Sequence, residues 1–150
     1  MELKIPPVVV FFGFAGFMYL LATFLPFGYF DFFGRYYVVV GLVAFASIVA
    51  AVALFQFFRS RTTIDPTDPS KVSKLVEKGI FAYSRNPMYL ALLLLLLAWG
   101  IWLGNAFNTL LAAGFVAYMN RFQIIPEETV LLERFGKGYK QYCLNVRRWF

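Results

Sequence analysis

The sequence predicts an all-α, polytopic membrane protein with about four transmembrane helices and an amphipathic, helical C-terminal tail. Of its 150 residues, 61% are hydrophobic and 21% aromatic, whereas only 15% are charged. A soluble domain of this length carries roughly a quarter charged residues. The apolar residues form four blocks that fill most of the chain. We therefore expect a single integral membrane domain over residues 1–150.

Each apolar block is close to the roughly 20 residues that a spanning helix needs. The first block is longer than the apolar region of a signal peptide, and no small-residue cleavage site follows it, so we expect it to be retained. Only the short turn at 105–108 separates the last two blocks, which must therefore form an antiparallel hairpin. The expected spans are about 6–27, 36–58, 87–103 and 109–125.

The basic residues predict the orientation in the membrane. They concentrate in the loop 59–86 and in the region from Arg121 to the end of the tail 126–150, whereas the other two connections hold only Arg35. Because Lys and Arg mark cytoplasmic loops, both termini should be cytoplasmic, at the cell inner membrane if the protein is prokaryotic. The net charge of +6 is explained in this way. Nucleic-acid binding is not expected, since no basic patch interleaved with exposed aromatics lies outside the spans.

Two further regions should be helical outside the spans. Ser70 can cap a short amphipathic surface helix that ends at Gly79. After Pro126 the tail shows helical spacing, which breaks at Gly136 and Gly138 and then resumes. This aromatic tail should pack on the cytoplasmic end of the helix bundle.

The residue types that are missing exclude much chemistry. The chain contains no His and only one Cys, Cys143. An internal disulfide, a Cys-cluster metal site, ordinary zinc or haem ligation by His and a His general base are therefore excluded. We predict no metal site.

Polar residues gather at two places that the hairpin should bring together. One is the segment 83–89 at the entrance of the third span, and the other is the end of the fourth span, from Asn120 to Glu128. Polar groups at this depth are costly unless they face protein or a water-filled cavity. Because the two spans are antiparallel, Arg85 should return to the level of Glu127 and Glu128, so that opposite charges converge on one cytoplasmic pocket.

Taken singly, these residues have simpler structural explanations. An arginine such as Arg85, taken alone, is more often a basic anchor at the membrane interface. Glu127 and Glu128 could be favourable charges in the first turn of a new helix. Arg121, Arg147 or Arg148 could orient an anionic substrate, but each is equally well a cytoplasmic anchor.

The ordered combination of motifs is more specific than any one residue. The chain reads GIFAYSRNPMYL at 79–90, then a span, a tight turn and a span, then IPEETVL at 125–131, FGKGYKQY at 135–142 and VRRW at 146–149. Over about residues 62–150 it resembles the superfamily of isoprenylcysteine carboxyl methyltransferases and phospholipid methyltransferases. The first two spans show only generic hydrophobicity.

The resemblance implies that S-adenosylmethionine is the cofactor, held by the last two spans and the tail. Its carboxylate would pair with Arg85, assisted by Asn86, and its ammonium or ribose hydroxyls would bind Glu127 and Glu128. Tyrosines would stack on the adenine or face the sulfonium. The catalytic residues implied are Arg85, Asn86 and Glu128, and the cofactor-binding residues are Leu75, Val76, Gly79, Tyr83, Arg85, Asn86, Tyr89, Glu127, Glu128 and Tyr139.

One position departs from the family pattern, because many relatives carry His where this chain has Asn86. An amide keeps the hydrogen bonds of that position but cannot act as a titrating base. The expected function is S-adenosylmethionine-dependent methyl transfer to a lipophilic or lipid-anchored acceptor, such as an isoprenylcysteine carboxylate or a phospholipid headgroup. The alternatives are a non-catalytic membrane scaffold, a small multidrug-type transporter and a membrane reductase similar to the sterol reductases.

Overall fold

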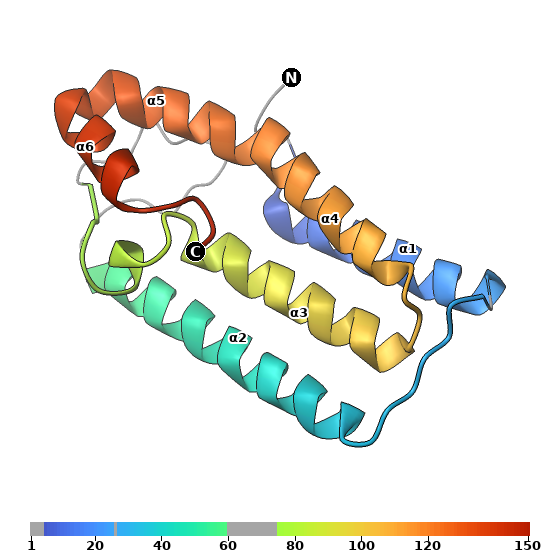
Figure 1. Ribbon diagram of the computed structural model, residues 1–150. Coiled ribbons are helices and arrows are strands. Elements are labelled where there is room, and N and C mark those ends of the chain that lie inside the picture. Colours follow the sequence, from blue (N-terminus) through green and yellow to red (C-terminus); the bar gives the residue numbers. More distant parts are fainter. Residues whose placement is uncertain (1–4, 26, 60–74) are drawn as a thin grey trace.

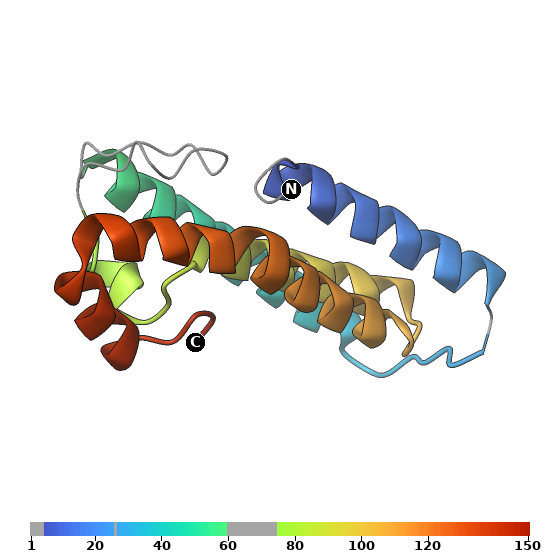
Figure 2. The same cartoon turned by 90° about the horizontal axis from the view of Figure 1, so that it is seen from above.

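The computed structural model describes residues 5–25, 27–59 and 75–150, and all the regular elements within these ranges are helices. The predicted all-α class is therefore confirmed. Helices α4, η3 and α5 follow one another without a break and form one long rod, from which α6 folds back (Figures 1 and 2). In chain order the elements are α1 (Pro7–Phe24), α2 (Arg35–Arg59), the 3₁₀-helix η2 (Gly79–Ala82), α3 (Pro87–Leu103), α4 (Asn108–Met119), the π-helix η3 (Asn120–Ile124), α5 (Ile125–Phe135) and α6 (Lys137–Asn145).

Two of the four expected spans, α1 and α2, are long and apolar enough to cross a membrane, and α3 is a shorter apolar helix. The first span ends three residues earlier than expected, at Phe24. Only 17% of the apolar stretch of α1, and the same share of α2, is buried inside the protein. Large apolar side chains such as Phe12 and Phe55 point outwards, being 66% and 65% exposed. An apolar surface of this extent is typical of contact with lipid.

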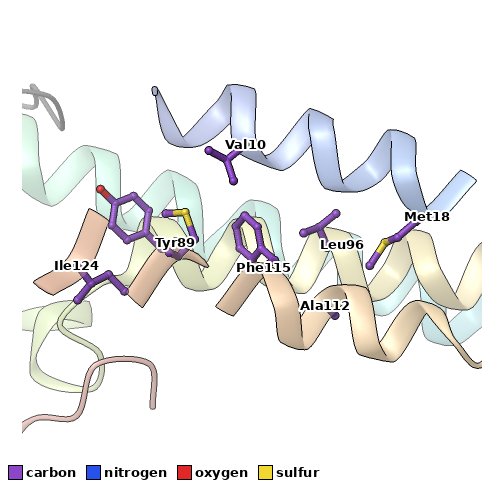
Figure 3. Close-up of a cluster of buried hydrophobic side chains, with 8 residues drawn as sticks. Val10, Met18, Tyr89, Leu96, Ala112, Phe115 and Ile124 are labelled. Carbon is purple, nitrogen blue, oxygen red and sulfur yellow. The ribbon is translucent and has the colours of Figure 1, made fainter. Parts of the chain in front are cut away.

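Helix α3 lies at the centre of the bundle, packed against α2 on one side and against α1 and α4 on the other (Figure 1). Side chains of these helices fill the space between α1, α3 and α4 (Figure 3). The rings of Phe14 and Phe115 pack edge to face, with their centroids 5.7 Å apart. The Trp99 indole donates a hydrogen bond to the Ala15 carbonyl at 3.1 Å. The buried cluster consists of Val10, Met18, Tyr89, Leu96, Ala112, Phe115, Met119 and Ile124.

The predicted hairpin between the third and fourth apolar blocks is confirmed. Gly104 ends α3 in the left-handed region with φ 67°, and a Cβ there would lie 2.9 Å from the Phe30 carbonyl oxygen. Its position therefore favours glycine on both counts. Asn105 then ties the turn to the loop after α1, because its amide donates to the Leu25 carbonyl at 2.9 Å. The hairpin returns the chain to the end of the bundle from which α3 started.

Two local expectations were wrong. The expected surface helix begins at Ser70, which lies outside the described residues, but residues 75–78 are not helical, and Gly79 begins η2 instead of ending a helix. In the tail, only Gly136 interrupts the helix, with φ 53°, whereas Gly138 lies inside α6. A single residue of positive φ is enough to separate α5 from α6.

Candidate active site

The site lies where the start of α3 meets the start of α5, at the end of the bundle opposite the hairpin turn. Pro87 occupies the first turn of α3, where its missing N–H costs no hydrogen bond, so the polar segment 84–86 comes directly before the helix. Pro126 has the corresponding place in α5 and is followed by Glu127 and Glu128. The first motif thus precedes a free helix start, whereas the second lies within the rod, where the π-helix η3 passes into α5.

The expected approach of Arg85 to the acidic pair is confirmed for Glu128. The Arg85 Nη1 atom lies 3.0 Å from Glu128 Oε1. Arg148 binds the same carboxylate with both arms of its guanidinium, Nε to Oε1 at 2.9 Å and Nη2 to Oε2 at 2.7 Å. Glu128 is therefore held between two arginines, one from the start of α3 and one from the C-terminal segment. Such charge-assisted, two-armed contacts are strong and fix the orientation of the carboxylate.

Glu127 faces α3 instead of Arg85. The buried Tyr89 hydroxyl donates a hydrogen bond to its Oε1. Burial raises the pKa of Glu127 to about 8, the Tyr89 hydrogen bond opposes this increase, and the nearby Glu128 carboxylate adds to it. The two adjacent glutamates thus have different surroundings, one beside arginines and one beside a tyrosine.

The C-terminal segment is bound to the entrance of α3 through its backbone. The Arg85 N–H donates to the Arg147 carbonyl at 3.0 Å, and the Asn86 amide donates to the Arg148 carbonyl at 3.1 Å. The hydroxyl of the buried Ser84 donates to that same carbonyl at 3.3 Å. The C-terminus therefore lies beside the start of α3 (Figure 1). Sequence reasoning assigned no role to Ser84, because a serine before a helix is most simply a cap or turn residue.

Tyr139 belongs to a buried cluster with Tyr142 and Val146, here called the aromatic layer. It is buried, and its ring lies 6.1 Å from that of Tyr142, whose hydroxyl donates to the Phe81 carbonyl at 2.6 Å. Burial raises the pKa of both tyrosines. Cys143 joins this layer and accepts a hydrogen bond from Arg85 Nη1. Tyr139 is thus a neighbour of the charged network, which consists of Arg85, Glu128 and Arg148. No direct hydrogen bond joins Tyr139 to Glu128.

The other predicted residues divide into two groups. Leu75 packs against the aromatic layer, and Val76 is half-buried next to it in the chain. Gly79 is exposed and packs against Gln56 of α2, and Tyr83 is 81% exposed. The structure therefore brings Leu75 to the edge of the site but does not bring Tyr83 or Gly79 to the acidic pair.

The π-helix η3 lies within the rod, between α4 and α5. The Ile125 N–H reaches back five residues to the Asn120 carbonyl, directly before Pro126. Single π-turns of this kind occur frequently at functional sites. Asn120 accepts a hydrogen bond from the Trp149 indole at 3.1 Å, and the buried Gln123 amide donates to the Ile5 carbonyl at 2.6 Å. The π-helix is therefore hydrogen-bonded to residues near both ends of the chain, Ile5 and Trp149.

A shallow, open surface pocket of about 280 Å³ lies beside Glu128, lined by residues of α5 and α6. It combines the carboxylate of Glu128 with apolar, hydroxyl, thiol and cationic groups. An amphipathic lining of this kind suits a ligand that carries both charged and apolar parts. The lining residues are Ile125, Glu128, Thr129, Leu132, Tyr139, Lys140 and Cys143.

Comparison with known proteins identifies the family of the chain. The family model of the phospholipid methyltransferases matches residues 16–138, which is most of the chain. The chain belongs to this family. Phospholipid methyltransferase family members are membrane methyltransferases, which accounts for the outward-facing apolar helices α1 and α2. The family implies a methyl donor and lipid or lipid-anchored substrates.

Two individual proteins are also similar in sequence to the chain. The chain is 52% identical over 62 residues to an uncharacterized protein of Haemophilus influenzae, a match that covers 41% of this chain and 98% of that protein. It is 30% identical over 106 residues to the protein-S-isoprenylcysteine O-methyltransferase of Schizosaccharomyces pombe, covering 71% of this chain. The match spans 45% of the latter protein, less than half of its length. No solved structure is significantly similar to the chain.

Proposed function

We propose that this phospholipid methyltransferase family member transfers a methyl group from S-adenosylmethionine to a lipophilic acceptor, such as an isoprenylcysteine carboxylate or a phospholipid headgroup. The observation that carries the proposal is the meeting of Arg85 with Glu128 at 3.0 Å, next to the pair formed by Glu127 and Tyr89. Two side-chain pairs, one of opposite charges and one of an acid with a hydroxyl, thus lie at the end of an apolar bundle, and their acids are adjacent in the chain.

The residues present fit the charged groups of S-adenosylmethionine. The side chain of Arg85 is only 11% exposed, and its buried Nε atom has no hydrogen-bond partner. A buried N–H without a partner is costly, and a carboxylate would satisfy it. Glu128 would receive the ammonium group, and Glu127 with Tyr89 would receive the ribose hydroxyls. Asn86, Tyr139, Leu75 and Val76 would complete the binding surface.

The chemistry needs alignment more than acid–base assistance. Bound S-adenosylmethionine supplies an electrophilic methyl carbon on its sulfonium sulfur. The protein's part is to hold the methyl donor and the nucleophilic atom of the acceptor in line and to exclude water, which can lower a barrier by about 7–11 kcal/mol. Arg85, Asn86 and Glu128 would position the reacting groups. A carboxylate acceptor needs no proton removal, whereas an amine would release its proton to Glu128 or to water.

The apolar surface supports a matching membrane arrangement. We infer four spans, α1, α2, α3 and the apolar part of the rod that begins with α4, within a single membrane domain. Both termini and the site would face the cytoplasm, where the basic residues concentrate. The acceptor would then reach the site laterally from the bilayer, and the methyl donor would enter from water.

The experiment is transfer of radiolabelled methyl from S-adenosylmethionine by the purified protein. The protein is incubated with a membrane lipid extract, and the labelled species is identified. Wild type and the matched variant Glu133→Gln, whose residue is exposed on α5, should label the same species. Glu128→Gln should reduce the rate at least a hundredfold. Equal labelling by wild type and Glu128→Gln, or none by wild type, would overturn the proposal.

A further inference from the structure

Arg148 in the C-terminal segment is already bound to Glu128, the carboxylate that we propose for the ammonium group of the ligand. Arg148 contacts both oxygen atoms of the Glu128 carboxylate, whereas Arg85 contacts one. The two guanidiniums occupy three of the roughly four acceptor sites of this carboxylate, and their two positive charges outweigh its single negative charge and repel a further cation. A ligand's ammonium can therefore bind Glu128 well only if one of the two guanidiniums withdraws.

The two arginines differ in their freedom to withdraw. The Arg85 side chain is 11% exposed and also donates a hydrogen bond to Cys143, whereas the Arg148 side chain is 39% exposed. Moving Arg148 into water carries no desolvation penalty, and the hydration that its guanidinium gains offsets part of the lost ion pair. Leaving Glu128 beside Arg85 alone still keeps the carboxylate paired. Arg148 is therefore the group that exchanges.

The backbone around Arg148 is held independently of its side chain. Its carbonyl oxygen accepts hydrogen bonds from Ser84 and Asn86, and the indole of the next residue, Trp149, donates to Asn120. The guanidinium can thus leave Glu128 while the C-terminal segment stays attached to the bundle. Exchange requires a rotation of one side chain and no unfolding of the tail.

We propose that Arg148 is a further residue of the binding site, namely the exchangeable counter-ion that occupies Glu128 until the ammonium group of the ligand replaces it. This inference rests on the proposed function. Breaking the Arg148–Glu128 pair costs free energy, and this cost lowers the affinity for ligands that carry an ammonium group. A ligand that lacks the ammonium leaves Arg148 in place and is insensitive to it.

The test is calorimetric titration of the full-length protein with S-adenosylhomocysteine, which carries the ammonium, and with 5′-methylthioadenosine, which lacks it. Arg148→Met removes the competing charge, so the Kd for S-adenosylhomocysteine should fall about two- to fivefold, the range for a partly exposed charged pair. Arg147→Met, which changes the exposed neighbour, should bind as wild type. Arg148→Lys keeps the charge but loses the two-armed contact, and it should show a smaller fall.

The outcomes separate this inference from the proposed function. A Kd that is unchanged or higher in Arg148→Met, with wild type binding normally, overturns the exchange and leaves the methyl-transfer proposal standing. An equal fall for both ligands also overturns it, because the gain would then be unrelated to the ammonium. If no variant binds S-adenosylhomocysteine, both proposals fail. Should Arg148→Met not fold, the same comparison is made with Arg148→Lys, in which an unchanged Kd overturns the exchange.

Discussion

The replacement Glu127→Gln should make the protein more stable towards high pH. Burial raises the pKa of Glu127 from 4.5 to about 8 in the folded protein, so between these values the folded state holds a proton that the unfolded state has released. The stability contributed by the protonated carboxyl is therefore complete below about pH 4.5, and it is lost as the pH rises to about 8. A glutamine keeps the shape of the side chain and does not titrate.

The loss accumulates to about 4 kcal/mol between pH 5 and pH 8, since each pKa unit corresponds to about 1.4 kcal/mol. The assay is the free energy of unfolding of the detergent-purified protein at several pH values, for wild type, Glu127→Gln and the exposed control Glu133→Gln. The gap between wild type and Glu127→Gln should widen in favour of the variant as the pH rises. A gap that stays constant over this range would refute the assignment of Glu127 as a buried, protonated acid.

Two further substitutions test the packing that positions the site. Gly104→Ala places a Cβ where φ is 67° and where a backbone carbonyl lies 2.9 Å away, so we expect a loss of about 2 kcal/mol in thermal unfolding. Gly41→Ala, in an open position on α2, should be neutral or slightly stabilising, and equal effects would contradict the assigned turn. Tyr142→Phe removes the buried hydrogen bond to the Phe81 carbonyl and should cost about 1–2 kcal/mol in the same measurement. The exposed Tyr36→Phe serves as its control, and a Tyr142→Phe protein as stable as this control would contradict the bond.

The convergence of Arg85 with Glu128 could be predicted because it follows from chain geometry. Two apolar segments joined by a turn of a few residues must run antiparallel, and residues at similar distances from the turn then lie at the same level. The prediction needed only the lengths of the segments and the positions of the charges. It did not depend on how the side chains pack. It was therefore confirmed, whereas the expected helix ending at Gly79 and the expected break at Gly138 were wrong.

The role of Arg148 could not be predicted in this way. It follows the last helix in an irregular segment, where no periodicity indicates the direction of a side chain. Its partner is selected by backbone hydrogen bonds to Asn86 and Ser84, which the sequence does not display. The exposure of Tyr83 was missed as well, because the sequence does not reveal η2, the 3₁₀-helix directly before Tyr83.

The most direct test of the central claim is to locate the bound methyl donor on the chain. Ultraviolet crosslinking of methyl-labelled S-adenosylmethionine to the purified protein, followed by proteolysis and mass spectrometry, identifies the residues that hold it. The account predicts label within residues 75–90 and 120–149, competed by S-adenosylhomocysteine and strongly reduced in Glu128→Gln. Competable label confined to α1 or α2, or label unaffected by Glu128→Gln, would contradict it.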